Sequence, residues 1–413
     1  MRLLKFEAKM TSLERRELNQ GFPYFIVGIV ILGWISISFP RMIFPPILPL
    51  IENAYNISHA QAGLLMSAYM LPYASMQIPT GFLIQRFGKK RFMVASVFGA
   101  AIPAFLMSFA STFEHVLLLR FIQGFLSGMW YSSSTTLVTD ITEERSRGKG
   151  VGLSMIGGPI SMTAINLIVG LISFSDWRTY LLLSAPPGII CGLLIIFRVG
   201  EENIGDTKRE SMGRSSFIKA IKIPMISLTL FFSFITALAG WGLMTFVPTY
   251  LVSEKGALVS EASLMLIFNS AASAFAGPLG GFLTDKFSYW LPTIVSITAM
   301  CSVSYFLPIL PLGMGTAAIF GVWGAMGGMS GTSLILLISH IVPSKIRGAI
   351  LGANNTMGFI SATIGPVIFG YVADVLGFTF FFRLALILNL AGLIMLLLMM
   401  KLRHNIEAYR KSL

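Results

Sequence analysis

The stretch Gly81-Phe82-Leu83-Ile84-Gln85-Arg86-Phe87-Gly88-Lys89-Lys90-Arg91 joins two long apolar segments. Its beginning recurs 200 residues later as Gly281-Phe282-Leu283-Thr284-Asp285-Lys286-Phe287. Six further landmarks recur at the same offset, so that Gly124, Gly128, Met129, Arg147, Gly148 and Gly152 return as Gly324, Gly328, Met329, Arg347, Gly348 and Gly352. Ordered matches at one fixed spacing indicate two structural halves of the same topology.

The composition is typical of a chain that lies in a membrane. Of 413 residues, 55% are hydrophobic and 12% are charged, which excludes a water-soluble globule. Charged and turn-forming clusters separate apolar stretches that are each long enough for the ~20 helical residues that cross a bilayer. The sequence therefore predicts an all-α polytopic membrane protein. We expect twelve transmembrane helices in two pseudo-symmetric six-helix bundles, near residues 22–51, 60–84, 92–111, 116–139, 150–174, 178–198, 224–252, 262–284, 291–311, 315–341, 349–374 and 378–400.

Basic residues gather in seven segments that hold 25 of the 30 lysines and arginines. Because positively charged loops remain cytoplasmic, we expect both termini inside a multi-pass protein of the cell inner (cytoplasmic) membrane. Charge scattered in this way disfavours nucleic-acid binding. The expected divisions are a cytoplasmic segment 1–21, a first bundle 22–198, a cytoplasmic linker 199–223, a second bundle 224–400 and a cytoplasmic tail 401–413.

Groups that carry metal, redox or enzyme chemistry are sparse. Cys191 and Cys301 fall within apolar spans, where a thiol behaves as a small hydrophobe. The four histidines are dispersed and form no paired pattern with carboxylates. We therefore predict no metal site, no cofactor and no enzyme activity. The first 20 residues have no uninterrupted apolar region, which argues against a cleaved signal peptide.

The run that begins at Gly81 resembles motif A of the major facilitator superfamily, whose pattern is Gly-x-Leu-x-Asp-Arg-x-Gly-Arg-Lys/Arg. The run at Gly281 resembles a degenerate copy, and Arg120-Phe121-Ile122-Gln123-Gly124 resembles the family's motif B. The resemblance covers essentially the whole chain. It implies a secondary transporter that moves a small-molecule substrate by alternating access, with or without a coupling ion, and that is usually a monomer. These motifs specify the superfamily and not the substrate.

Both copies of motif A are expected to lie at a cytoplasmic gate. Gly81 would let the second span approach a neighbouring helix closely, and Gly88 would permit a tight turn. In the family an acidic residue at the fifth position helps to latch this side. Gln85 stands there, whereas Asp285 keeps the carboxylate in the second copy, so we expect an asymmetric gate. The alternative is a basic loop that only fixes topology. The predicted gate residues are Gly81, Gln85, Arg86, Gly88, Lys89, Gly281, Asp285, Arg147 and Arg347.

Among the single residues of the chain, Arg41 restricts the possible class of substrate most. Counted back from residue 51, it lies ~15 Å inside the membrane, where an arginine costs at least ~2.5 kcal/mol unless it faces a cavity or a partner. No span carries Asp, Glu or Lys in its interior. We therefore favour contact with the substrate. First-span arginines contact anions in organophosphate carriers of this superfamily, although no arginine matches in the seventh span, where Trp241 stands. The alternative is that Arg41 caps carbonyl groups freed by Pro45, Pro46 and Pro49.

Arg120 is open to two interpretations. Motif B arginines in the family are often assigned to proton coupling or to a polar network with the first span, yet an arginine near the outer boundary could also snorkel to the interface. Other polar residues would line a cavity between the bundles, or join helices as hydrogen-bonding pairs. The predicted substrate-binding residues are Arg41, Tyr69, Tyr73, Gln123, Tyr131, Asn166, Trp241, Asn269, Asn354 and Asn355.

The missing acidic side chains bear directly on function. Exporters of cationic drugs usually need a membrane-embedded carboxylate, and this chain offers none, so cationic drug efflux is disfavoured. The sequence favours a transporter of a carboxylate-type organic anion that contacts Arg41. The alternatives are a carrier of a neutral solute or a drug-type exporter with Arg41 purely structural, and a transporter-like membrane sensor that binds without translocation.

Overall fold

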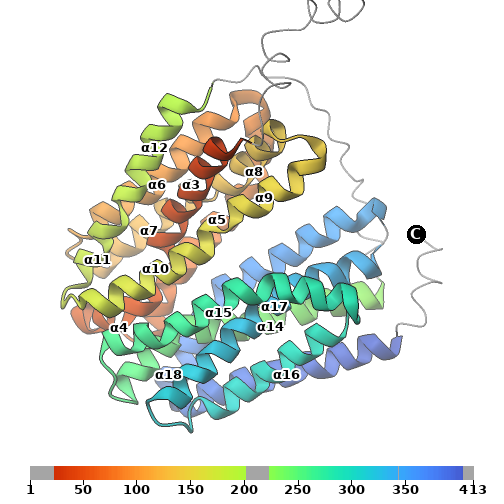
Figure 1. The fold of residues 1–413 in the computed structure, drawn as a ribbon. Coiled ribbons are helices and arrows are strands. Elements are labelled where there is room, and N and C mark those ends of the chain that lie inside the picture. The colour runs from red at the N-terminus through yellow and green to blue at the C-terminus, as the bar shows by residue number, and fades with distance from the viewer. Residues whose placement is uncertain (1–22, 201–222, 343, 403–413) are drawn as a thin grey trace, which may run out of the picture.

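The computed structural model describes residues 23–200, 223–342 and 344–402, and within these ranges all regular structure is helical. The predicted segment 1–21, nearly all of the linker 199–223, and the predicted tail 401–413 beyond residue 402 lie outside the described residues. The first bundle, in red to yellow-green in Figure 1, contains α3 (Tyr24–Met42), α4 (Phe44–Tyr55), α5 (His59–Phe87), α6 (Lys89–Met107), α7 (Phe113–Ser127), α8 (Trp130–Ile141), a 3-10 turn (Glu144–Ser146), α9 (Arg147–Met155), α10 (Gly157–Ile172), α11 (Trp177–Ser184) and α12 (Pro186–Arg198).

The second bundle, in green to blue, consists of longer and less interrupted helices. Its elements are α14 (Pro224–Ser253), α15 (Val259–Lys286), α16 (Leu291–Phe306), α17 (Met314–Ile341) and α18 (Ser344–Leu402). The last of these is two spans in sequence, because Gly377 breaks the helix with φ 77° and ψ 169°. This φ lies in the region that only glycine adopts without strain.

In the part of the chain that the structure describes, joining the broken helices in order gives twelve spans. In the first bundle α3 with α4, α7 with α8, α9 with α10, and α11 with α12 each make one span. Eight helical segments of the described chain are long and apolar enough to cross a membrane, and Leu291–Phe306 is a shorter apolar helix. Large apolar side chains on outward surfaces, such as Phe197 and Leu171 with exposed fractions of 77% and 71%, suit contact with lipid. The predicted fold class is confirmed.

Pairs of glycines 200 residues apart pack in the same way in the two bundles. A Cβ atom added at Gly124 would lie 2.1 Å from the carbonyl oxygen of Tyr69, and one added at Gly324 would lie 1.8 Å from that of Asn269. Helix α7 therefore meets α5 backbone to backbone, as α17 meets α15. Small residues permit this close approach between membrane helices. The repeat in the sequence is thus a repeat in helix packing.

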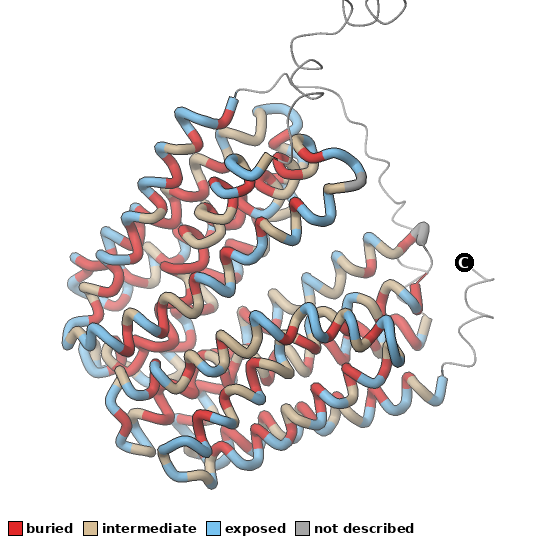
Figure 2. Tube along the Cα trace, viewed as in Figure 1, coloured by how far each residue is buried: buried red, intermediate tan, exposed pale blue. Residues whose placement is uncertain are grey.

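The two bundles converge at one end and separate at the other (Figure 1). We call the first the closed end; it contains His59 and Asp374. We call the second the open end; it contains Tyr24, Gly88 and Leu402. Buried residues follow the interior of each bundle and the convergent region, whereas the outward faces are exposed (Figure 2). Figure 1 therefore shows a conformation in which the bundles meet at one end only.

Several helix pairs join the bundles at the closed end, among them α5 with α18, α10 with α15 and α4 with α14. Helix α5 runs along the first part of α18, where a Cβ at Gly63 would lie 2.6 Å from the Pro366 carbonyl oxygen. The hydroxyl of Ser67 donates to the carbonyl oxygen of Thr363 on the same pair. Helix α10 meets α15, where the amide of Asn166 donates to the Leu266 carbonyl oxygen over 3.3 Å. Close backbone contact thus seals this end.

Candidate functional site

Arg41 lies beside a break in the first span. Pro45 and Pro46 occupy the first turn of α4, and neither can donate a backbone hydrogen bond to the turn before it. The α3 helix ends at Met42 for this reason. Arg41 therefore sits where the helical hydrogen-bond ladder is interrupted, at the junction of α3 and α4.

Arg120 on α7 is completely buried behind this break. Its Nε donates to the carbonyl oxygen of Leu65 over 2.9 Å, and one Nη donates to Pro40 over 3.4 Å and to Gln123 over 3.0 Å. The expectation that Arg120 could snorkel to the interface is wrong, because these acceptors draw the guanidinium inward. Arg120 thus donates to the Pro40 carbonyl oxygen near the break and connects α7 to the first span.

Aromatic rings lie between Arg120 and Arg41. The Arg120 guanidinium lies 4.1 Å from the Phe44 ring centre and 4.6 Å from that of Tyr69. Tyr69 stacks on Tyr73 with 5.6 Å between ring centres, and the Arg41 guanidinium lies 5.5 Å from the Tyr73 ring centre. Ring faces attract cations, so Arg120, Tyr69, Tyr73 and Arg41 form one continuous row, which we call the Arg41 ladder.

The ladder ends where the two bundles meet. Tyr73 on α5 contacts Phe359 on α18 of the second bundle, with ring centres 5.5 Å apart. The Nε of Arg41 is buried and has no hydrogen-bond partner among the described residues. The same holds for Ser38 Oγ on α3 and for Ser161 Oγ and Asn166 Oδ1 on α10. Buried polar atoms without partners are uncommon, and a ligand or water usually satisfies them.

The remaining predicted substrate-binding residues divide into those with internal partners and those without. Gln123 donates to the Ala100 carbonyl oxygen over 2.8 Å, and Asn354 lies 2.5 Å from the hydroxyl of Ser233. Tyr131 packs edge-on against Trp34 at 6.2 Å. Asn355 is exposed, and Trp241 and Asn269 are half-buried on α14 and α15. The structure therefore brings Arg41, Tyr69 and Tyr73 together. Gln123 and Asn354 have partners within the protein, and so does the Nδ2 of Asn166.

The predicted gate residues lie at the open end. Gly88 adopts φ 81°, as a tight turn between α5 and α6 requires. Lys89 forms an ion pair with Asp140 on α8, and Arg147 Nε donates to the Thr139 carbonyl oxygen. Gln85, Arg86 and Asp285 are exposed, while Arg347 is half-buried with its Nε unpartnered among the described residues.

One expectation about this gate is wrong for this conformation. A Cβ at Gly81 would meet nothing within 4 Å, and one at Gly281 would meet only the Thr332 methyl group at 3.6 Å. The close helix approach expected at Gly81 is absent because the bundles are separated at this end.

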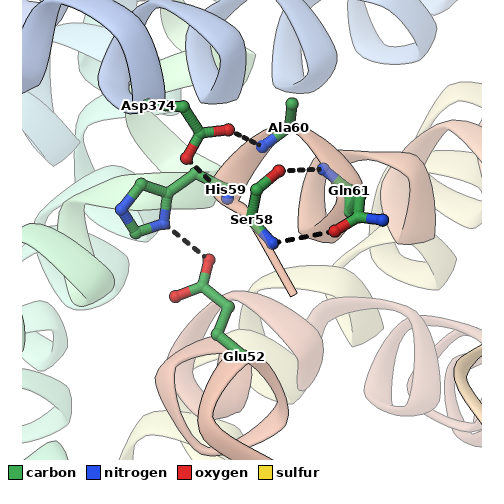
Figure 3. Close-up of polar contacts among 6 residues, drawn as sticks. All are labelled: Glu52, Ser58, His59, Ala60, Gln61 and Asp374. Atoms are coloured by element: carbon green, nitrogen blue, oxygen red, sulfur yellow. Dashed lines mark hydrogen bonds and ion pairs between the residues drawn. The ribbon is translucent and has the colours of Figure 1, made fainter. Parts of the chain in front are cut away.

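Three ionisable residues that the sequence analysis did not assign meet at the closed end (Figure 3). Glu52 on α4 and His59 at the start of α5 lie 2.9 Å apart, and Asp374 on α18 accepts hydrogen bonds from the backbone of His59 and Ala60. The sequence predicted Glu52 and His59 in the loop between the spans 22–51 and 60–84, and Asp374 at the end of the span 349–374, with no functional role for any of them. The sequence did contain a signal for the start of α5, the capping box of Ser58 and Gln61. Nothing in it brought residues 52 and 374 together.

Two six-helix bundles of one topology, joined at one end and separated at the other, define a membrane transporter built for alternating access. The model of the Major Facilitator Superfamily matches residues 30–366. The chain belongs to this superfamily, and it is a transporter rather than an enzyme.

Relatives and solved structures agree with this assignment. The cis,cis-muconate transport protein of Acinetobacter baylyi is 24% identical, covering 78% of this chain and 81% of its own. The probable sulfoacetate transporter SauU of Cupriavidus necator is 21% identical, over 85% and 87%. A bacterial homologue of the human lysosomal transporter Spinster, solved in an inward-facing conformation, superposes with a TM-score of 0.75 at 17% identity, covering 92% of this chain and 96% of its own. That likeness concerns the fold.

Proposed function

We propose that this transporter carries a carboxylate-type organic anion, and that Arg41 contacts the carboxylate. The observation that carries the proposal is the buried Arg41 Nε, which lacks a partner at the junction of the two bundles. A carboxylate there would gain a charge-assisted hydrogen bond in a place where an unpaired arginine is costly.

The charge around Arg41 supports an anion. Arg120 lies near enough that the two arginines repel each other. Among the described residues, neither arginine has an ion pair with an acidic side chain. Arg120 is surrounded by carbonyl oxygens and ring faces, which leaves Arg41 as the cation nearer to the second bundle. A negatively charged solute would relieve this local excess of positive charge.

The names of several relatives agree with this substrate class. Muconate and sulfoacetate, named for two of them, are carboxylates. A probable galactarate/D-glucarate transporter of Escherichia coli is 22% identical over 78% of this chain. These names support a carboxylate as the class of substrate.

We further propose that the open end faces the cytoplasm and that transport proceeds by rocking of one bundle against the other. Basic residues gather at the open end, as positively charged cytoplasmic loops do. The conformation in Figure 1, in which the bundles are separated at the open end, would then be inward-facing. Cytoplasmic termini follow from the same orientation.

Flux measurements test the substrate class. We expect purified protein in liposomes to take up labelled mono- or dicarboxylates and not sugars or cationic drugs. Uptake of a neutral or cationic solute alone would contradict the proposal. Carboxylate binding in nanodiscs without uptake, in a preparation with intact folding, would instead indicate a sensor that has kept the site and lost translocation.

A further inference from the structure

Glu52, His59 and Asp374 form a cluster at the closed end (Figure 3). His59 Nδ1 lies 2.9 Å from a carboxylate oxygen of Glu52, and the exposed fractions of the two side chains are 25% and 9%. Both residues belong to the first bundle. His59 precedes the apolar stretch 60–84, so it lies at the edge of the membrane-spanning part.

Asp374 brings the second bundle into this cluster. One carboxylate oxygen accepts from the backbone N–H of His59 over 2.9 Å, and the other accepts from Ala60 over 2.8 Å. The start of α5 is thus capped by a carboxylate from α18. An ionised carboxylate is favoured at this position because helix N-termini carry partial positive charge. These two bonds must break when the bundles separate at the closed end.

The His59 ring also fills the space between the bundles. It lies edge-on to Phe378 on α18 and to Phe246 on α14, with ring centres 5.3 Å and 6.0 Å apart. Glu254 at the end of α14 acts on His59 electrostatically, together with Glu52 and Asp374. With a neutral His59, Asp374 of the second bundle acts unfavourably on charged Glu52 of the first.

We propose that His59 is a proton-binding site that controls opening of the closed end, with Glu52 holding its ring and Asp374 connecting it to the second bundle. Binding of a proton places a positive charge among these carboxylates and stabilises the closed end. The proton comes from the compartment that the closed end faces. This inference is independent of the substrate class proposed for Arg41.

The sign of the pH dependence follows from the geometry. The hydrogen bond to Glu52 raises the pKa of His59, burial opposes the rise, and Asp374 and Glu254 add to it. Glu52 stays beside His59 when the bundles part, because both lie in the first bundle. The difference between the two conformations comes from the second bundle, where Asp374 and Glu254 favour the charged ring and burial against Phe246 and Phe378 opposes it. We infer that the two carboxylates outweigh this burial, so protonated His59 stabilises the closed end at pH values below the pKa that the ring has in the open conformation. This stabilisation is lost as the pH rises through the raised pKa of the closed conformation.

Distances across the closed end test the proposal without any substrate. Spin labels at Ser111→Cys and Leu258→Cys, with Cys191 and Cys301 replaced by serine, would report the separation of the bundles in nanodiscs at about pH 5.5 and 8.5. We expect the open-to-closed ratio to rise severalfold at the higher pH, at most about tenfold for each pKa unit that separates the two conformations. His59→Gln keeps a donor for Glu52 and removes the charge, so its ratio should be high and independent of pH.

Two variants complete the design. His59→Arg carries a permanent charge and should keep the closed end shut at both pH values. His115→Gln alters an exposed histidine that is also near this end, and it should retain the pH response of the wild type. An unchanged pH response in His59→Gln would overturn the proposal.

A direct titration covers the case in which His59→Gln does not fold. Imidazole resonances of isotope-labelled protein, assigned with the His115→Gln variant, would give the pKa of His59 with and without Asp374→Asn. We expect the pKa to fall when Asp374 loses its charge. A His59 resonance that does not respond to this substitution would equally overturn the proposal.

Discussion

Arg120 and Arg41 occupy neighbouring positions in one bundle but have different surroundings. Arg120 is completely buried and donates to two backbone carbonyl oxygens and to Gln123. Arg41 has a buried Nε without a partner among the described residues. From these surroundings we infer that Arg120 holds the broken first span in place, and that Arg41 is the arginine available to a ligand.

We predict that Arg120→Leu destabilises the protein, whether or not substrate is present. The substitution leaves the carbonyl oxygens of Leu65 and Pro40 without a donor, and each buried acceptor left in this way costs about 1–3 kcal/mol. Thermal unfolding in detergent would measure the loss. Arg383→Leu is the matched control, because Arg383 is exposed beside Phe380. Equal melting temperatures for the two variants would show that Arg120 has no structural role.

At the scale of helices, glycines decide which elements touch. Gly124 and Gly128 bring α7 against the backbone of α5, and their counterparts Gly324 and Gly328 bring α17 against α15. These four positions are where the repeated sequence has direct structural meaning, since a side chain at any of them would overlap a carbonyl oxygen of the facing helix.

We therefore predict that Gly124→Ala and Gly324→Ala each lower the stability by about 1–3 kcal/mol, because overpacking forces the paired helices apart. Gly152→Ala is the control, since a Cβ there meets nothing within 4 Å. Denaturation of the three variants in the same detergent gives the comparison. If the control loses as much stability as the other two, the close packing is not the cause.

The motif A region supports a prediction about the gate. Gln85→Asp restores the acidic residue of the family pattern, and we expect it to favour the conformation in which the open end is shut, because a carboxylate binds basic groups more strongly than an amide does. Accessibility of cysteines introduced at this end would measure the shift. Populations equal to those of the wild type would refute the asymmetric gate. Gln85→Asn, which keeps an uncharged amide at the same position, controls for a general effect of substitution.

Helices and their repeat could be predicted from the sequence because hydrophobic length and fixed spacing are local signals. The sequence also indicated Arg41, since a charge in an apolar span is conspicuous. It could not show that Arg120 donates to Pro40, or that Asp374 caps α5, because both contacts join residues far apart in the chain. Pro45 and Pro46 indicated a break in the first span, whereas the break at Gly128 was missed as a helix boundary because no proline marks it.

For the whole molecule, the contact of α5 with α18 sets the conformation. Gly63 lies against Pro366, and Gly370 lies against the backbone of His59. These close approaches exist only while the closed end is shut, so the two glycines favour one of the conformations that a rocking transporter must visit.

We predict that Gly63→Leu and Gly370→Leu shift the population towards a molecule that is open at this end, because each side chain must displace backbone atoms less than 3 Å away. Crosslinking of cysteine pairs placed across the closed end should fall in both variants. Gly28→Leu, where a Cβ meets nothing within 4 Å, is the control. Undiminished crosslinking would show that helix contact at the glycines does not determine the conformation.

The proposed role of Arg41 as the anion contact is tested most directly by uptake of a labelled carboxylate into liposomes that contain the Arg41→Gln variant. We predict at least about tenfold slower uptake, since a hydrogen bond between charged groups contributes about 1.5–3 kcal/mol. Arg383→Gln should transport at the wild-type rate. Carboxylate uptake at the wild-type rate by a folded Arg41→Gln variant would contradict the account.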